Sequence, residues 1–158
     1  NRIKLFAVAT VITSSVLASF GGVDEKAWLT EVIEETGTTI VEKACDGGYG
    51  LYQLHTNNQG EITKDQLTIC TDAVGDDHEA YMETLKHEAV HVAQACNGWD
   101  AATGRSEKWL KVQMGRDYDL EKLLDGYEEA HHYNELEAYY LETKTTAEIV
   151  GVVQDACR

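Results

Sequence analysis

Five consecutive residues, His87-Glu88-Ala89-Val90-His91, place two imidazoles and one carboxylate close together along the chain. In a helix, residues four positions apart lie on the same face, so both imidazoles can reach one metal ion. Zinc accepts neutral imidazole nitrogens in a tetrahedral site, and a catalytic zinc keeps one position open for water. Glu88 projects about 100° around the helix from His87, where it can reach that water without binding the metal. The HExxH pattern therefore predicts two zinc ligands, His87 and His91, and a general base, Glu88.

The sequence around the motif predicts the helix that this chemistry requires. Asp76 and Asp77 are N-cap candidates, and Asn97-Gly98 is a signal for the end of a helix. Between these signals, apolar residues recur at steps of three and four and form a stripe for the core: Met82, Leu85, Ala89, Val92 and Cys96. We therefore expect the two histidines on the side of the helix opposite this stripe.

A zinc site needs a third protein ligand, and the candidates lie between residues 130 and 142. This stretch also has helical periodicity, and Glu135 shares one side of the helix with His131. Glu137 points about 200° away from Glu135, so the two cannot serve the same face. From the residues alone, the third ligand is Glu135, His131, His132 or Glu137. Glu128, Glu129 and Glu142 are expected on a solvated face.

Together, the two segments resemble the gluzincin group of zincin metallopeptidases, in which a Glu on a later helix completes the HExxH site. Asn134-Glu135 matches the opening of the Asn-Glu-x-x-x-Asp pattern, and residues 135–138 match the opening of Glu-x-x-Ala-Asp. Both alignments select Glu135 as the third ligand. Tyr139 stands where these peptidases have an Asp that supports a zinc ligand, so the resemblance predicts a different support or none.

The resemblance covers these two helices and implies a zinc-dependent enzyme that hydrolyses the bonds of a peptide or protein substrate. Zinc would activate a water molecule, Glu88 would accept its proton, and a Tyr or His would help to stabilise the oxyanion. The candidates for this last role, or for support of a ligand, are Tyr139, His131 and Tyr133. Such peptidases also align the substrate along an edge strand, and residues 66–71 are the candidate for that strand.

The order of the predicted elements indicates an α+β fold. A helix over residues 24–36 is followed by strands at 38–44, 50–55 and 61–70. Beyond the HExxH helix, helices are expected over 106–114, 118–124, 130–142 and 146–157. The sequence thus predicts a single zincin-like domain over residues 19–158, with a small antiparallel sheet, the HExxH helix and a helical C-terminal half.

The first 18 residues have the layout of a secretory signal peptide. Arg2 and Lys4 precede a mostly apolar run, and small or permissive residues precede a cleavage site near Ala18. A retained anchor over residues 6–23 is the alternative, but this run is short and contains Ser, Thr and Gly. We therefore expect an exported protein, periplasmic, extracellular or envelope-associated, whose mature form has no stable membrane span.

Charge and cysteine content narrow the partners and the compartment. The formal net charge is −15, and so acidic a surface repels phosphate backbones, which argues against a nucleic-acid partner. An even number of cysteines in an exported chain predicts two disulfides, and four cysteines allow three pairings. The candidates are Cys45, Cys70, Cys96 and Cys157. Because Cys96 closes the HExxH helix, a disulfide there would fix the scaffold of the site.

Two other functions remain compatible with these residues. A catalytically inactive zinc-binding or structural module of the cell envelope would need His87 and His91 but not Glu88. An envelope-associated helical protein without metal would need none of the three. The presence of Glu88 in the motif favours the peptidase.

Overall fold

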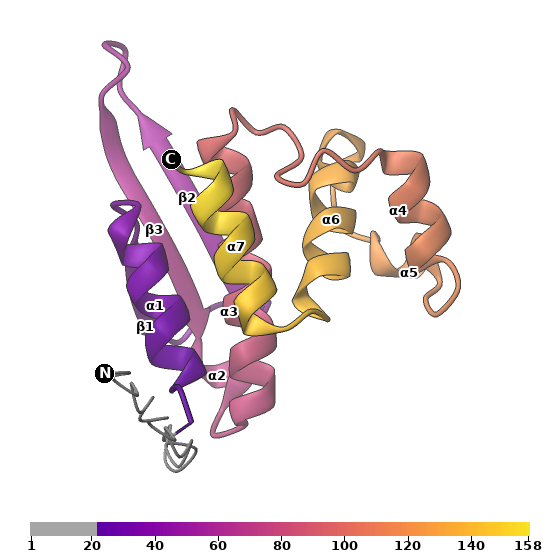
Figure 1. The fold of residues 1–158 in the computed structure, drawn as a ribbon, viewed down its shortest axis with the longest axis horizontal. Coiled ribbons are helices and arrows are strands. Elements are labelled where there is room, and N and C mark those ends of the chain that lie inside the picture. The colour runs from indigo at the N-terminus through magenta and orange to yellow at the C-terminus, as the bar shows by residue number, and fades with distance from the viewer. Residues whose placement is uncertain (1–21) are drawn as a thin grey trace, which may run out of the picture.

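The computed structural model describes residues 22–158, and the predicted signal segment 1–18 lies outside them. In the described part of the chain, helix α1 is followed by three strands, six further α-helices and one short 3-10 helix, η1. The predicted α+β class is confirmed, because a three-stranded mixed sheet is followed by a mostly helical C-terminal half (Figure 1).

The sheet contains β1 (Thr39–Lys43), β2 (Gly50–Thr56) and β3 (Ile62–Cys70) in the spatial order β1-β3-β2. The strands β2 and β3 form the predicted antiparallel hairpin, whereas β1 pairs with β3 in parallel, so the sheet is mixed. The candidate for the substrate-aligning edge, residues 66–71, falls in β3 except for Thr71, which begins α2 (Thr71–Val74). That prediction was wrong, because β3 is the central strand and both of its sides are paired. The outer strand β2 packs against the HExxH helix instead.

The HExxH helix is α3 (His78–Cys96), and its two ends lie at the capping residues predicted from the sequence. The Asp77 side chain caps its N-terminus by accepting hydrogen bonds from the backbone N–H groups of Glu79 and Ala80, at 2.9 and 3.1 Å. Asn97 is the C-cap, and Gly98 follows in the left-handed region with a φ of 70°. The helix contacts β2, β3, α1, α6 and α7, so every layer of the fold meets it (Figure 1).

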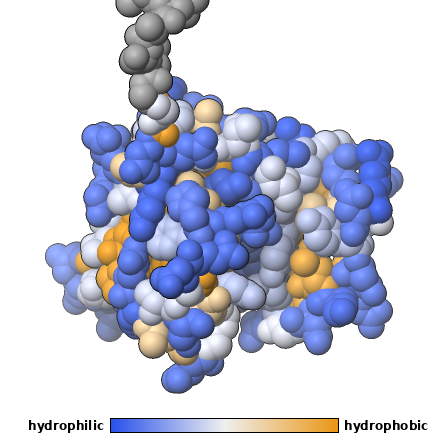
Figure 2. All heavy atoms as spheres, turned by 90° about the horizontal axis from the view of Figure 1, so that it is seen from below, coloured by the Kyte–Doolittle hydropathy of each residue, from blue (hydrophilic) through white to orange (hydrophobic). Residues whose placement is uncertain are grey.

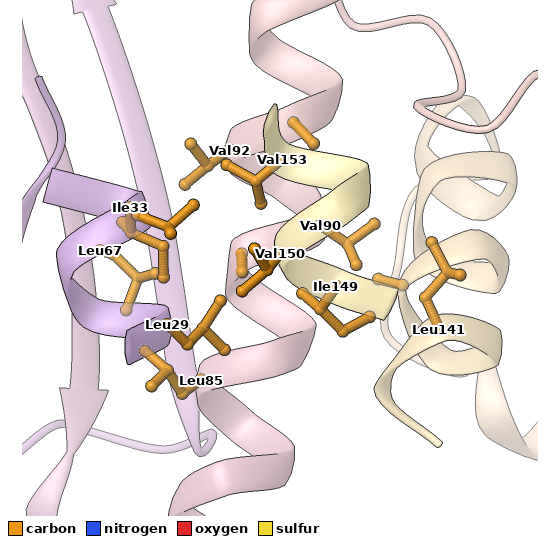
Figure 3. Packing of buried hydrophobic residues seen from close by; sticks show 14 of the residues in the cluster. Leu29, Ile33, Leu67, Leu85, Val90, Val92, Leu141, Ile149, Val150 and Val153 are labelled. Carbon is orange, nitrogen blue, oxygen red and sulfur yellow. The ribbon is translucent and has the colours of Figure 1, made fainter. Parts of the chain in front are cut away.

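The main core lies between the sheet and the helices α1 (Glu25–Glu35), α3 and α7 (Thr146–Ala156) (Figure 3). A second, smaller cluster joins α4 (Glu107–Met114) to α6 (His132–Glu142) through four buried residues: Leu110, Met114, Leu124 and Leu136. Because Leu141 of α6 belongs to the main core, α6 connects the two clusters. The short helices are α2 (Thr71–Val74), α5 (Leu120–Leu123) and η1 (Glu129–His131).

Two disulfides join these elements, and together they use all four cysteines of the chain. Cys45–Cys70 links the segment after β1 to the end of β3, and Cys96–Cys157 links the C-terminal ends of α3 and α7. Disulfides persist in oxidising compartments, so this pairing indicates such a location. Among residues 22–158, the helices are too short or too polar to cross a membrane. The face drawn in Figure 2 is mostly hydrophilic, with apolar residues in separate patches.

We expect the double substitution Cys96→Ser with Cys157→Ser to lower the free energy of unfolding by about 3–4 kcal/mol, because this disulfide restricts a long loop of the unfolded chain. The bridged residues are separated by 61 positions, against 25 for Cys45–Cys70. Removing the shorter bridge should therefore cost about 0.5–1 kcal/mol less. Denaturant unfolding followed by circular dichroism measures both losses, and a larger loss for the shorter loop would contradict this explanation.

Candidate metal centre

Three side chains predicted as zinc ligands converge on one point between α3 and α6. The Nε2 atoms of His87 and His91 lie 3.2 Å apart, and the Glu135 carboxylate oxygens lie 3.3 Å and 3.5 Å from them, respectively. Ligand atoms held about 2.0–2.1 Å from a tetrahedral zinc ion are about 3.3–3.4 Å from one another. The spacing of these atoms therefore fits a single ion of that size. In the described part of the chain, they form one candidate metal-binding group.

Helix geometry and apolar burial bring the three residues together. One turn of α3 separates His87 from His91 and places both on the face that meets α6. Glu135 lies in the first turn of α6. Val90 of α3 and Leu141 of α6 lie in the same buried cluster, which holds the two helices against each other beside the polar centre (Figure 3).

Both imidazoles are oriented by a second partner on the side away from the centre. The Nδ1 atom of His87 lies 2.7 Å from Glu142 Oε2, and the Nδ1 atom of His91 lies 2.8 Å from Gln94 Oε1. Each of these oxygens accepts a hydrogen bond from Nδ1–H, so in the neutral ring the lone pair of Nε2 faces the centre. This is the tautomer that a metal-binding imidazole requires.

Glu142 therefore does not lie on a solvated face as expected, because its carboxylate contacts His87. The resemblance had left the support of the zinc ligands open, since Tyr139 replaces the usual Asp. Glu142 supplies a carboxylate from a position three residues beyond Tyr139 on the same helix. A carboxylate on the outer nitrogen of a ligating His fixes the ring and raises its basicity.

The electrostatics of the group favour a positive charge at its centre. Burial lowers the pKa of His87, but hydrogen bonds to Glu135 and Glu142 outweigh burial and raise this pKa to about 10. Burial raises the pKa of Glu135, but its bonds to His87 and His91 lower this pKa to about 2. Where no cation is bound, a proton supplies the positive charge. A metal ion must therefore displace that proton.

The predicted general base, Glu88, is buried beside the ligands and outside the metal-binding group. Burial raises the pKa of its carboxyl, and the charges of His91 and His87 oppose this rise. The strand β2 crosses directly over this side chain. A methyl group added at Gly50 would lie 2.8 Å from Glu88 Oε1 and 2.6 Å from Thr84 Cγ2, so a larger residue at this crossing would displace these side chains.

Two cavities, of about 640 Å³ and 550 Å³, flank the group and share part of their walls. The shared residues are Gly50, His87, Glu88 and Tyr127. We call the larger one the Trp99 cavity, because it extends along Leu51, Tyr52 and Trp99. We call the other the Glu83 cavity, because it extends along Tyr49 and Glu83. The two cavities together form a cleft, and Glu88 lies where they meet.

The three candidates for the oxyanion donor lie in different places. The Tyr139 ring stands edge-on to His87, with ring centroids 4.8 Å apart, and lines the Glu83 cavity. His131 is exposed and lines the Trp99 cavity, outside the metal-binding group. Tyr133 lines neither cavity, and its hydroxyl donates a hydrogen bond to the backbone carbonyl of Arg105.

Sequence reasoning missed Tyr127, which lines both cavities. Its hydroxyl lies 3.2 Å from that of Tyr139, and His132 Nε2 lies 3.0 Å from its backbone carbonyl. Burial raises the pKa of Tyr127, and the Tyr139 hydroxyl and the Glu135 charge add to this rise. The phenol therefore keeps its proton and can act as a donor. Tyr127 lies between α5 and η1, where helical periodicity gives no signal.

The alternative ligand Glu137 serves another purpose. Its side chain is fully buried and accepts hydrogen bonds from Gln94 Nε2 at 2.9 Å and from the Ala102 backbone N–H at 2.8 Å. The Thr103 backbone N–H and hydroxyl donate to its other oxygen at 2.9 and 2.6 Å. Because Gln94 also contacts His91, Glu137 ties the loop after α3 to the support of a ligand. The same contacts hold its carboxylate away from the metal-binding group.

A family model described as "Domain of unknown function (DUF8637)" matches residues 57–157, which is more than half of the chain. The chain belongs to the DUF8637 family. The matched part contains His87, Glu88, His91 and Glu135, whereas β2 precedes it. No curated protein and no solved structure matches the chain.

We expect the protein to bind one zinc ion, and the affinity to fall in a defined order when carboxylates are replaced. Glu135→Gln removes a ligand and should weaken binding by more than about 100-fold, whereas Glu142→Gln removes only the support of His87 and should cost about 10- to 100-fold. The exposed Glu129→Gln is the matched control and should have no effect. Competition with a chelating dye measures the three affinities. Equal losses for Glu135→Gln and Glu129→Gln would exclude this site.

Zinc affinity should rise with pH, because the His87 pKa of about 10 in the metal-free protein lies above its ordinary value. Below that pKa the ring holds a proton that zinc must displace, so the apparent association constant should increase at least about tenfold per pH unit between about pH 6 and 9. Above about pH 10 it should level off. Dye competition at several pH values tests the slope, and a flat profile would contradict the proton displacement.

Proposed function

We propose that this chain is a zinc-dependent peptidase. The observation that supports it best is the combination of a tetrahedrally spaced ligand set with a buried carboxylate, Glu88, in an accessible cleft. Burying a carboxylate costs free energy, and Glu88 lies outside the group of three ligands, so zinc binding alone does not account for it. A zinc ion that is only structural is usually closed by a fourth protein ligand, whereas three ligands leave one position for water. Two histidines, a third ligand and a base are the minimum set for metal-assisted hydrolysis of an amide.

The donor set fits zinc, because imidazole nitrogens with one carboxylate are common ligands of catalytic zinc. Bound there, zinc would lower the pKa of a water molecule and polarise the carbonyl of the substrate. Glu88 would accept the proton of the attacking water and later deliver it to the leaving amine. Burial, which raises the pKa of Glu88, makes its carboxylate a better proton acceptor than an exposed one.

Tyr127 is the residue best placed to donate a hydrogen bond to the oxyanion. It lines both cavities beside Glu88, and its raised pKa keeps the phenol protonated. Tyr139 contacts the Tyr127 hydroxyl at 3.2 Å and can hold it in place. Donors fixed where negative charge develops stabilise the transition state, because they need no reorganisation during the reaction.

The substrate would be a peptide segment in an extended conformation. As an outer strand, β2 offers backbone N–H and C=O groups to such a segment, and it crosses over Glu88 at Gly50. A segment added to this edge would place one of its carbonyls beside Glu88. The two disulfides support a role for this activity in an oxidising compartment outside the cytoplasm.

We expect Glu88→Gln to keep zinc binding and to lower peptide hydrolysis by about 10²- to 10⁴-fold, because it removes the proton acceptor and leaves the ligands in place. Digestion of a peptide library, followed by mass spectrometry, measures the activity, and dye competition measures the zinc. Glu79→Gln, an exposed substitution on the same helix, is the control.

Two results would contradict the peptidase. Full activity of Glu88→Gln would exclude the assigned base. Stoichiometric zinc without any hydrolysis by the unmodified protein would favour the second candidate, an inactive zinc-binding module of the cell envelope.

A further inference from the structure

Trp99 has an unfavourable backbone conformation at the wall of the cleft. Its φ is 67°, and among the described residues it is the one residue other than glycine with a positive φ. A bulky side chain rarely adopts this conformation unless its surroundings impose it, and such residues gather at functional sites. Here the Trp99 backbone N–H donates to the Gln94 carbonyl at 2.7 Å, and Asn134 Nδ2 donates to the Trp99 carbonyl at 3.1 Å. Both partners come from the helices that carry the zinc ligands.

The Trp99 side chain presents an apolar surface inside the cleft. It is 48% exposed, lines the cavity named after it, and lies with its ring centroid 6.0 Å from that of Tyr52 on β2. Eight large apolar side chains are strongly exposed in the described part of the chain. Four of them line the two cavities: Tyr49, Leu51, Trp99 and Tyr127. Apolar surface exposed at such density beside a reactive group marks a binding site.

The residues that line the cleft bear on which substrate side chain it can accept. Neither cavity is lined by Lys or Arg, whereas Glu88 and Glu135 line the Trp99 cavity and Glu83 and Glu142 line the other. An acidic side chain would therefore find no Lys or Arg partner in either cavity. The Trp99 cavity instead suits a large uncharged side chain, which can stack on the indole ring and bury its own apolar surface.

The direction of β2 fixes which part of a substrate reaches Trp99. The chain enters the cleft at Tyr49 in the Glu83 cavity, passes Gly50 above Glu88, and leaves along Leu51 and Tyr52 in the Trp99 cavity. An added strand is more stable when antiparallel. It would run in the opposite direction, with its N-terminal half beside Trp99.

We propose that Trp99 forms a subsite for a bulky apolar side chain that precedes the bond to be cleaved. The inference rests on the peptidase function proposed above and defines its substrate as an extended peptide with a Phe, Trp, Leu or similar residue at this point. The hydrogen bonds of the Trp99 backbone to Gln94 and Asn134 hold this residue beside the two helices that carry the ligands. The subsite thus selects which peptide bond lies over Glu88.

The test uses octapeptides of one polar host sequence without acidic residues, in which a single Phe or Ala occupies successive positions. Mass spectrometry should show cleavage directly after Phe, and kcat/KM should be about 10- to 100-fold higher for Phe than for Ala. Trp99→Asn removes the ring but tolerates a positive φ, and it should reduce this ratio by about tenfold or more. Tyr118→Asn is the control, because Tyr118 is similarly exposed, at 46%, but lines neither cavity.

Binding to the zinc-loaded and zinc-free Glu88→Gln protein separates this inference from the proposed function. Calorimetry should give a dissociation constant about tenfold lower for the Phe peptides, and the further substitution Trp99→Asn should abolish the difference. Tighter binding of the Phe peptides without any cleavage by the unmodified protein would overturn the peptidase and support the subsite.

Three results would overturn the subsite and leave the peptidase standing. They are cleavage at equal rates for Phe and Ala peptides, cleavage before Phe, and a preference for Phe that survives Trp99→Asn. If the peptides are neither bound nor cleaved, both the subsite and the peptidase function are overturned.

Discussion

The contact between α3 and α6 is the interaction on which the site depends. On its polar side, Glu135 meets both histidines, and Gln94 joins His91 to Glu137. On its apolar side, Val90 and Leu141 belong to the main core. Buried charged and polar groups destabilise a protein unless each has a partner, and here the partners are supplied mutually by the two helices. The sheet and α7 hold α3 from one side, and the small cluster with α4 holds α6 from the other.

The two histidines are supported unequally, which sets the charge of the centre. His87 has a carboxylate, Glu142, on its outer nitrogen, whereas His91 has the neutral amide of Gln94. With Glu135 as a ligand and Glu88 nearby, three carboxylates surround two imidazoles. A divalent cation would therefore leave the cluster with about one negative charge, so the surrounding carboxylates would more than neutralise the ion. Because Gln94 is neutral, its contact with His91 adds no further negative charge to the cluster. Its amide nitrogen also donates a hydrogen bond to Glu137.

The sequence predicts local features of this fold well and long-range ones poorly. The Asp77 cap and the ends of α3 depend on spacings within one helix, where side-chain direction follows from periodicity. The choice of Glu135 depended on the resemblance to the gluzincins, because periodicity alone left four candidates. Periodicity reports which face a residue occupies but not what that face meets. Glu142 therefore looked solvated although α3 covers it, and the parallel pairing of β1 with β3 was invisible. Tyr127 and Trp99 lie outside the helices and strands, where no repeating pattern applies.

The Cys96–Cys157 bridge divides the ligand set in a way that bears on how the centre is assembled. Both histidines precede the bridge in sequence, whereas Glu135 lies inside the covalent loop that it closes. Once this bond has formed, α6 is confined near α3 before any ion arrives. The chain then loses the conformational entropy of bringing distant ligands together when the disulfide forms and the chain folds. Little of this entropy is left to be lost when an ion binds. The site is in this sense preorganised, because the Cys96–Cys157 bridge holds its three side chains near one another whether or not an ion is bound.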